Sequence, residues 1–406
     1  MHRQYAATAG AALLGVALLS CSAVPVLAAK PTAPKRTVVT TTEDDTNNDG
    51  ATDRRGIFSK GYDTKNRLVR DTLEADNDAD GVIDATRVIT YQYDKAGRLT
   101  QEVASQESGG ASWVTTTTST YDSNGYLVRN LVEADGNGDG VLDLRSSTTY
   151  ANDGQGNVLV SVNSQDQGAD GSIESVFKVT SAYDSAGRRV SEVSEGDSPV
   201  DNVADNRTTI AWMYDGAGAV LERSVQVDLG ANGSVELVEQ QSYTYDEAGR
   251  LVSSLLESDD NADGALSLRV STSQLYGPGG ELVQIRTEID QATAAGGAID
   301  GVVDSASTRR ISYDQAGNKV EEVTDDQTGG TLVRQLTRYT YDADSRLLST
   351  DVTVEIDRVP VFRQTVANSY NTRGQLILEV SDRDDDANGT IDATSTSTTV
   401  YDGVKR

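Results

Sequence analysis

The most regular feature of the chain is an alternation of apolar and polar residues in short segments. Segments rich in Val, Ile, Thr and Tyr, such as 87–93 and 115–121, recur along the chain, and Ile89, Tyr91 and Tyr93 show the two-residue period. This period is typical of β-strands, and Pro, which interrupts sheet pairing, occurs only six times. Beyond residue 29 no useful length of sequence has the 3.6-residue period of an amphipathic helix. The pattern predicts an all-β chain.

A recurring turn motif sets the length of the repeating unit. Tyr-Asp-x-x-Gly-x-Leu occurs in full at 93–99 and 245–251, and related copies follow one another at intervals of 28 to 37 residues, most often 31. Asp-x-x-Gly is a turn sequence, because Asp accepts main-chain hydrogen bonds and Gly tolerates a positive φ. The twelve copies begin at positions 62, 93, 121, 152, 183, 214, 245, 276, 313, 341, 370 and 401.

A second element, Asp-x-Asn/Asp-x-Asp-Gly-x-x-Asp, lies between these turns. Two 28-residue repeats have Gly109-Gly110 or Gly329-Gly330 in its place. Gly-Gly between strands favours a tight hairpin turn, so the acidic element is itself expected to be a hairpin loop. The 37-residue repeat has an enlarged loop around 293–297. The best copies are 45–53, 76–84, 135–143 and 384–392; 259–267 lacks only the last acid, and 166–174 and 228–236 are degraded.

Together these patterns predict tandem antiparallel β-hairpin repeats of about 31 residues over 45–406. Each repeat supplies turn, strand, turn and strand, which gives about two dozen strands in an extended or curled sheet or a partial shell. Successive hairpin connections alternate between the two ends of the strands. One edge of the sheet should therefore carry the Asp-x-x-Gly turns and the other the acidic loops.

The N-terminus has the features of an export signal. Arg3 precedes an apolar stretch at 6–19, and Val26 and Ala28 suit the positions before a cleavage site, so residues 1–29 are predicted to be a signal peptide. Residues 30–44 are expected to be a flexible linker. Alternatively, 18–21 resembles a lipoprotein box, which would place a lipid anchor on Cys21. Either interpretation puts the protein outside the cell or on its surface.

The net charge of the chain limits the classes of partner that it can bind. The whole sequence has 35 Lys and Arg against 63 Asp and Glu, and removal of 1–29, which contains only Arg3 among these residues, leaves a formal net charge of −29. Such a charge argues against binding to nucleic acid or to anionic membrane surfaces and favours divalent cations. The single Cys and the single His are Cys21 and His2. Because no Cys or His remains after residue 29, that part of the chain can form no disulfide, no zinc site with Cys or His ligands and no Ser-His-Asp triad.

The acidic loops are the candidate metal sites. Oxygen ligands at positions 1, 3, 5 and 9, with a carbonyl at position 7 and Gly at position 6, suit calcium, which takes six to eight oxygen ligands. Because Asp, Asn and Gly are also good turn formers, a purely structural role is the alternative, and it is preferred for 166–174 and 228–236. The predicted ligands of several weak calcium sites are Asp45, Asn47, Asp49, Asp53, Asp76, Asp78, Asp80, Asp84, Asp135, Asn137, Asp139, Asp143, Asp259, Asn261, Asp263, Asp384, Asp386, Asn388 and Asp392.

The Tyr-Asp motif is expected to be structural. The Tyr side chains should pack on neighbouring hairpins with their hydroxyls at the rim of the sheet. The Asp should accept amide hydrogen bonds within its own turn. The Arg after the Gly, as in Arg98, Arg188 and Arg250, is expected to pair with acids on adjacent strands in a solvated ion pair of little energy.

The motif Tyr-Asp-x-x-Gly-Arg-Leu, with a further Tyr two residues earlier at Tyr91, Tyr243 and Tyr339, resembles the YD-repeat (RHS) family over 62–402. That resemblance implies a ribbon of hairpins that spirals into a sheet or hollow shell, acting at cell surfaces, in adhesion or in toxin delivery. The acidic loops are similar to the calcium-binding loops of integrin-type propeller repeats and to the first half of EF-hand and dockerin loops. The closest copy is 135–143.

These observations favour a secreted or surface-attached structural and interaction protein with an extracellular protein or polysaccharide as partner. A carbohydrate-binding or carbohydrate-active protein and a toxin-delivery-type RHS shell fragment are the alternatives. The sequence predicts no enzyme and no catalytic residue, because every loop has carboxylates and none is singled out, while Trp113 and Trp212 lie in separate repeats. No membrane span is predicted, and segments such as 115–118 lack the alternating apolar residues of a transmembrane barrel.

Overall fold

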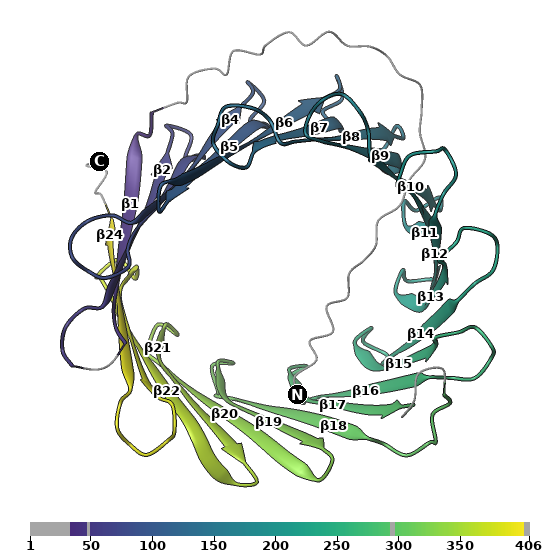
Figure 1. Ribbon diagram of the computed structural model, residues 1–406. Helices are drawn as coiled ribbons and strands as arrows, with labels where there is room; N and C mark the ends of the chain where they lie inside the picture. Colours follow the sequence, from purple (N-terminus) through teal and green to yellow (C-terminus); the bar gives the residue numbers. More distant parts are fainter. Residues whose placement is uncertain (1–32, 47–48, 293–296, 402–406) are drawn as a thin grey trace.

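The part of the protein that the structure describes folds into antiparallel β-hairpins. The computed structural model describes residues 33–46, 49–292 and 297–401, and these contain 24 strands and no helix (Figure 1). No helix in this part of the chain is long and apolar enough to cross a membrane. The predicted signal peptide at 1–29, with Cys21, lies outside the described residues. The all-β fold, the antiparallel hairpins and the number of strands predicted from the sequence are confirmed.

Every repeat supplies one strand that ends at the Tyr of the motif and a second that begins after its turn. The strands are β1 (Arg36–Asp45), β2 (Arg54–Tyr62), β3 (Leu68–Asp76), β4 (Ala85–Tyr93), β5 (Leu99–Ser108), β6 (Ala111–Tyr121), β7 (Leu127–Asp135), β8 (Leu144–Asn152), β9 (Val158–Gln167), β10 (Ser175–Tyr183), β11 (Arg189–Asp197), β12 (Asn206–Tyr214), β13 (Val220–Asp228), β14 (Leu237–Tyr245), β15 (Leu251–Asp259), β16 (Leu268–Tyr276), β17 (Leu282–Gln291), β18 (Ser305–Tyr313), β19 (Lys319–Thr328), β20 (Thr331–Tyr341), β21 (Leu347–Ile356), β22 (Val359–Tyr370), β23 (Leu376–Asp384) and β24 (Ala393–Tyr401).

The sheet closes on itself. β1 pairs with β2 on one side and antiparallel with β24 on the other, from Val38 opposite Tyr401 to Asp45 opposite Thr394. Figure 1 shows β24 beside β1, so the 24 strands form a closed barrel. The predicted extended or curled sheet or partial shell is therefore wrong in this respect. Closure satisfies the N–H and C=O groups that two open edges would leave unpaired.

The strand that closes the barrel lies in the range expected to be a linker. Residues 30–44 were predicted to be flexible, whereas Arg36–Asp45 forms β1. Its sequence, with Val38 and Val39 followed by three Thr, has a high β-propensity. The pairing partner β24 comes from the far end of the chain, so the local sequence alone gives no sign of this strand's place in the barrel.

The barrel wall is a single layer with almost no apolar core. At about 4.8 Å per strand, 24 strands give a circumference of roughly 115 Å and a width of at least about 37 Å between opposite backbones. Opposite walls are too far apart to pack together. Among the described residues the buried apolar side chains are Val69, Ala104, Val176, Val225 and Ile311. Stability must therefore come largely from the strand ladders and from contacts between neighbouring hairpins.

The Tyr-Asp turns are held by their own Asp, as predicted. The Oδ1 atom of Asp94 accepts the N–H of Arg98 at 2.9 Å, and the Gly97 N–H donates to the Asp94 carbonyl at 3.1 Å. The Arg98 N–H lowers the pKa of Asp94 despite the opposing effect of burial. Gly97 adopts φ +91°, which explains the Gly of the motif. The side chain at the Asp position accepts the same bond in the turns beginning at 63, 122, 153, 184, 215, 246, 314, 342 and 371.

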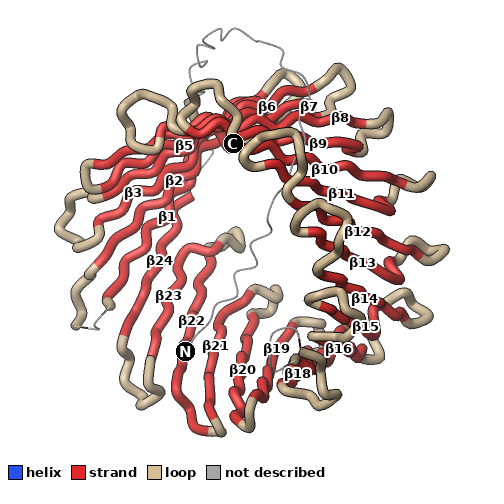
Figure 2. The backbone as a smooth tube through the Cα atoms, turned by 45° about the vertical axis from the view of Figure 1, so that its right-hand side comes forward, coloured by secondary structure: helices blue, strands red, loops and turns tan. Residues whose placement is uncertain are grey.

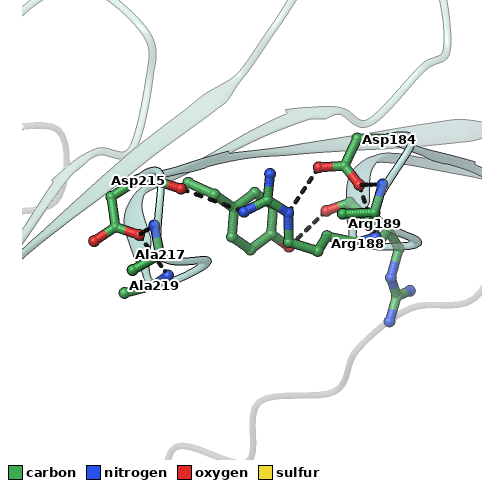
Figure 3. A network of polar contacts seen from close by, with 8 residues as sticks. Asp184, Arg188, Arg189, Asp215, Ala217 and Ala219 are labelled. Carbon is green, nitrogen blue, oxygen red and sulfur yellow. Dashed lines mark hydrogen bonds and ion pairs between the residues drawn. The ribbon is translucent and has the colours of Figure 1, made fainter. Parts of the chain in front are cut away.

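The Arg of the motif connects its own turn to the next hairpin, and the predicted pairing with acids on adjacent strands is wrong. Arg188 Nε donates to Asp184 Oδ2 of its own turn at 2.7 Å (Figure 3). Its guanidinium lies over the ring of Tyr214, 4.7 Å from the centroid, and its Nη1 donates to the Asp215 carbonyl at 3.3 Å. The planar guanidinium can serve the carboxylate and the ring at once, because its N–H groups lie in the plane and its face stacks.

The Tyr hydroxyls complete the connection between hairpins. The hydroxyl of Tyr93 donates to the carbonyl of Leu68, one hairpin earlier, at 2.8 Å. Asn152, which replaces Tyr in one repeat, donates from Nδ2 to the Leu127 carbonyl at 2.9 Å. The Tyr row therefore has the predicted packing role and also joins successive hairpins. Corresponding hydroxyl bonds are made by Tyr121, Tyr183, Tyr214, Tyr245, Tyr276, Tyr313, Tyr341, Tyr370 and Tyr401.

Candidate metal centres on the acidic rim

Nine acidic loops lie together at one end of the barrel. Each connects an odd-numbered strand to the next even-numbered one, and in an antiparallel meander all such connections share one end of the strands; Figure 2 shows the connections as loops at the strand ends. Three tight turns, around 109–110, 329–330 and 357–358, complete this end. We call the nine loops the acidic rim: 45–53, 76–84, 135–143, 166–174, 197–205, 228–236, 259–267, 290–304 and 384–392. Within two of these loops, 47–48 and 293–296 lie outside the described residues.

The acidic rim carries a charge equal to the net charge of the whole chain. Its nine loops contain 28 Asp and Glu and no Lys or Arg. The chain has 63 acidic residues, so 35 lie elsewhere, and they are balanced by the 35 Lys and Arg. The formal net charge of −28 is therefore concentrated at one end of the barrel. Repulsion among these carboxylates, and their attraction for cations, are strongest there.

Each loop is held by hydrogen bonds from its main chain to its own acids. In 76–84, Asp76 Oδ2 at position 1 accepts the Gly81 N–H at 3.0 Å, and Asp84 Oδ2 at position 9 accepts the Asn77 N–H at 2.7 Å. Asp80 Oδ1 at position 5 accepts the Val82 N–H at 2.8 Å. Gly81 has φ +91°, a conformation that Gly adopts without strain. The acids therefore help to shape the loop through their own hydrogen bonds.

The other predicted ligands follow the same scheme. The N–H of position 6 donates to the carboxylate at position 1, which is Asp45, Asp135, Asp259 or Asp384. The N–H of position 7 donates to the side chain at position 5, which is Asp49, Asp139, Asp263 or Asn388. The N–H of position 2 donates to the carboxylate at position 9, which is Asp53, Asp143 or Asp392. Asn137 and Asn261 at position 3 accept the position-5 N–H, and Asn47 lies outside the described residues. A carboxylate has lone pairs for both roles, so turn formation does not exclude metal binding.

Among the described residues, three carboxylates lie close enough to share a metal ion in two loops. Asp76, Asp78 and Asp84 form one triad, and Asp384, Asp386 and Asp392 form another, with one oxygen from each residue within 4.8 Å of the others. Position 3 is Asp only in these two loops and is Asn, Gly, Pro or Ala in the others. The loop 135–143, the closest copy by sequence, has Asn137 there. Within the described part of the acidic rim, these two triads bring carboxylate oxygens close enough together to hold a divalent cation.

One oxygen in the first triad is buried without a partner. Asp76 is 2% exposed; its Oδ2 accepts the Gly81 N–H, but its Oδ1 has no hydrogen-bond partner. A buried carboxylate oxygen without a donor is costly, and a bound cation would satisfy it. Asp166 Oδ1 and Asp290 Oδ1 are also buried and unpartnered. The same position-1 carboxylate is thus incompletely satisfied in three loops.

Local donors keep at least one rim carboxylate ionised. Burial of Asp135 opposes ionisation, but the backbone N–H groups of Gly140 and Gly138 outweigh it, so the pKa of Asp135 lies below its ordinary value. The Ser172 N–H likewise lowers the pKa of Asp170. Ionised carboxylates are the form that binds a hard cation.

Two loops of the acidic rim were missed in the sequence analysis. In 197–205, Asp197 is 1% exposed and accepts the N–H groups of Asp201 and Asn202 at 2.8 and 2.9 Å. Asn202 replaces the usual Gly and has φ +70°, which Asn tolerates better than most residues. Acids at positions 1, 5 and 9 would have revealed this loop. In 290–304, an insertion hides the spacing, yet Asp304 Oδ2 accepts the Gln291 N–H at 2.8 Å.

The two degraded copies, for which a purely structural role is predicted, keep the hydrogen bond at position 9. In 166–174 and 228–236 the last acid is Glu, and Glu174 and Glu236 accept the N–H of Gln167 at 2.6 Å and of Leu229 at 2.7 Å. The longer side chain thus reaches the same donor as Asp84. The loop 259–267 ends in Ser267, whose hydroxyl donates to the Ser258 carbonyl at 3.1 Å instead.

Comparison with known proteins gives similarities of structure only. No family model matches the chain, and no curated protein is similar to it in sequence. A crystal structure of TcdB2-TccC3 without its hypervariable C-terminal region is similar over 87% of this chain and 26% of that one, with 13% identity and a TM-score of 0.23. The chain thus spans about a quarter of that protein. A porin-like protein from Bacteroides uniformis is similar over 91% of this chain and 99% of its own, with 11% identity and a TM-score of 0.21.

Proposed function

We propose that the chain is a secreted or surface-attached structural and interaction protein, without enzymatic activity, in which calcium ions bind the acidic rim and stabilise the barrel. The observation that carries this proposal is Asp76 Oδ1, a buried carboxylate oxygen without a partner in a residue that forms a triad with Asp78 and Asp84. The triad of Asp384, Asp386 and Asp392 supports it.

The donor chemistry favours calcium over transition metals. The candidate ligands are carboxylate and amide oxygens, which hard cations prefer, and the only His and Cys are His2 and Cys21 in the predicted signal peptide. Calcium accepts irregular arrangements of six to eight oxygens, whereas magnesium requires a nearly octahedral site. The loops, which use their acids both to bend the chain and to converge, fit the less demanding ion.

Calcium would act on stability through the hairpins. Each acidic loop joins two paired strands, so repulsion among its carboxylates strains both. A cation that binds only the folded loop adds about 1.4 kcal/mol per site when its free concentration is about ten times Kd. Extracellular calcium modules commonly bind in the range of about 10⁻⁴ to 10⁻³ M. Millimolar calcium should therefore matter and micromolar calcium should not.

The proposal is tested by melting the mature protein with calcium and with chelator. Wild type should melt at a higher temperature in millimolar calcium. Asp78→Asn removes one charge of the triad but keeps an oxygen that can accept the Asp80 N–H, a hydrogen bond of 3.3 Å in the wild type. The rise in melting temperature with calcium should therefore be smaller in this variant. Its melting temperature in chelator should be nearly unchanged. The matched control, Asp94→Asn in a Tyr-Asp turn, should lower the melting temperature equally in calcium and in chelator. A wild-type melt that is indifferent to chelator would refute the proposal.

The closed wall favours a second candidate, a container of the RHS-shell type, over a carbohydrate-binding protein. A single-layer barrel at least about 37 Å wide has room for an enclosed chain.

This second candidate can be tested on the two faces of the wall. Thr396 and Ser397 are neighbours in β24 and so point to opposite faces of the wall. Each is replaced by Cys in turn and labelled with a small and a bulky maleimide. A container should exclude the bulky reagent from one face, and equal labelling of both faces would refute it.

A further inference from the structure

A hollow of about 360 Å³ lies beside the first of the two Asp triads. It is bounded on one side by the end of the loop 76–84 and the start of β4, and on the other by the tight turn at 109–110. Asp84 belongs both to the triad with Asp76 and Asp78 and to the lining of the hollow. We call this space the rim hollow, and its lining includes Ile83, Asp84, Thr86, Glu107, Ser108 and Ser112.

The rim hollow lies where the repeat pattern changes. Where one acidic loop follows another, the later loop can contact the earlier one, as when the Gly168 N–H donates to the carbonyl of Asp143 at 2.6 Å. Asp143 is position 9 of its loop, and Asp84 is the same position of 76–84. After Asp84, however, the next connection at this end of the barrel is the tight turn at 109–110. Space therefore remains beside Asp84 where another acidic loop would otherwise follow.

A cation held by this triad has coordination positions left for another molecule. Asp76 is 2% exposed and its Oδ1 has no hydrogen-bond partner, whereas Asp78 and Asp84 are exposed. Calcium takes six to eight oxygen ligands, and each residue of the triad offers one carboxylate oxygen. The remaining positions are filled by water or by oxygens of a ligand, and Asp84 places them next to the rim hollow.

The surrounding charge selects the class of ligand. The acidic rim contains 28 Asp and Glu and no Lys or Arg, so it repels a phosphate, a sulfate or a carboxylate. Glu107 adds another carboxylate to the lining of the rim hollow. The oxygens that complete the calcium site should therefore be neutral. Two neighbouring hydroxyl groups of a sugar ring supply two such oxygens at once, in place of two water molecules.

The lining of the rim hollow suits a sugar ring. The hydroxyl groups of Thr86, Ser108 and Ser112 can each donate and accept hydrogen bonds. Ile83 is 41% exposed and offers an apolar surface to the C–H groups of the ring. The volume of about 360 Å³ lies within the range of small-molecule sites, roughly 300–1,000 Å³.

We propose that the rim hollow binds a sugar unit of a polysaccharide through calcium. Two neighbouring hydroxyls of the sugar coordinate an ion held by Asp76, Asp78 and Asp84, and the ring lies in the rim hollow against Ile83. This inference rests on the calcium binding proposed above and names the chemistry of the partner. It is independent of whether the barrel encloses another chain, because the rim hollow lies at the end of the barrel.

The test is frontal affinity chromatography of the mature protein on immobilised mannan and on immobilised galactan, which present neighbouring hydroxyls in different orientations. Wild type should be retarded on at least one of them in millimolar calcium and on neither in chelator. The control matrix is the same polysaccharide after periodate cleavage and borohydride reduction, which break the bond between carbons with neighbouring hydroxyls. Absence of retardation on both polysaccharides would overturn the inference, as would retardation that persists in chelator or on the control matrix.

A variant that fills the rim hollow tests its position. Ala111 is exposed and lines the rim hollow just after the Gly-Gly turn, so Ala111→Trp should weaken binding to the polysaccharide at least about tenfold. The matched control is Thr331→Trp, at the same exposed place after the turn at 329–330, and it should bind as wild type does. Equal affinities of the two variants would refute binding in the rim hollow.

Calcium-dependent melting separates this inference from the proposed function. Calcium should raise the melting temperature of wild type and of Ala111→Trp alike, while only wild type is retarded. If calcium raises the melting temperature but wild type is not retarded, calcium binding stands and sugar binding is refuted. If calcium affects neither melting nor retardation, both are refuted. Calcium-dependent retardation without an effect on melting would support sugar binding and refute the stabilising role of calcium.

Discussion

The guanidinium of Arg98 lies over the ring of Tyr121, 4.7 Å from its centroid, and joins two consecutive repeats. The same Arg98 donates from Nε to Asp94 Oδ2 of its own turn at 2.6 Å. In a wall without an apolar core, such contacts hold one hairpin to the next. The guanidinium groups of Arg188 and Arg250 lie in the same way over the rings of Tyr214 and Tyr276. Arg188 also donates to Asp184 of its own turn (Figure 3).

Removal of a single Tyr hydroxyl should weaken one junction between hairpins. Tyr121→Phe keeps the ring under Arg98 but loses the hydrogen bond to the Leu99 carbonyl, which measures 2.8 Å. We expect a loss of about 0.5–1.5 kcal/mol in the free energy of unfolding by urea, the usual net worth of one hydrogen bond. Tyr91→Phe, whose hydroxyl lies outside this set of junction bonds, is the control and should cost less. Equal losses would contradict the role assigned to the junction.

The Tyr-Asp turns should make the barrel sensitive to acid. Backbone N–H groups lower the folded-state pKa of Asp94, Asp184 and Asp342 below the ordinary value of 3.8. A lowered folded pKa gives stability that is fully present above the unfolded pKa and is lost as the pH falls through the folded one. The free energy of unfolding in chelator should therefore fall as the pH drops below about 4.

A variant identifies the groups responsible for this acid sensitivity. Asp94→Asn removes one titrating carboxylate, so its free energy of unfolding should decline less steeply below the ordinary pKa of 3.8 than that of wild type. The measurement is a series of urea titrations across the acidic range. An identical pH slope in the variant and the wild type would show that Asp94 does not contribute.

The loop missed in the sequence analysis should depend on its first acid regardless of calcium. Asp197 is 1% exposed and accepts two backbone N–H groups, so Asp197→Asn buries an NH₂ group next to donors. We expect a loss of about 1–3 kcal/mol, the range for an unsatisfied buried polar group. The melting temperature should fall equally in calcium and in chelator. A loss confined to calcium would instead assign Asp197 a predominantly ligating role.

The seam of the barrel can be tested by a disulfide. Thr41 and Thr398 face each other across the β1–β24 pairing. With Thr41→Cys and Thr398→Cys in the mature protein, which lacks Cys21 if the signal peptide is cleaved as predicted, oxidation should form an internal disulfide that changes migration on a non-reducing gel. Thr41→Cys with Ser273→Cys in β16 is the control and should not form one, because disulfides require Cα atoms within about 7 Å. Failure of the seam pair to oxidise would contradict closure.

The parts of the fold that depend on neighbouring residues could be predicted from the sequence. The turn at Asp94 and Gly97 is closed by hydrogen bonds over three and four residues, and the loop from Asp76 to Asp84 by bonds over two to seven. Such local bonds need particular residue types at fixed spacing, so a regular pattern predicts them. The loop at Asp197 was missed because Asn202 takes the positive φ usually assigned to Gly.

The parts of the fold that depend on residues far apart in the sequence could not be predicted from it. Val38 pairs with Tyr401, and this contact turns an expected linker into β1 and an expected open sheet into a closed barrel. Arg98 reaches Tyr121 rather than an acid on an adjacent strand, and Asp76 Oδ1 is left buried without a donor. Closure depends on the twist and curvature accumulated over 24 strands, and each strand contributes too little of either for its own sequence to reveal the result.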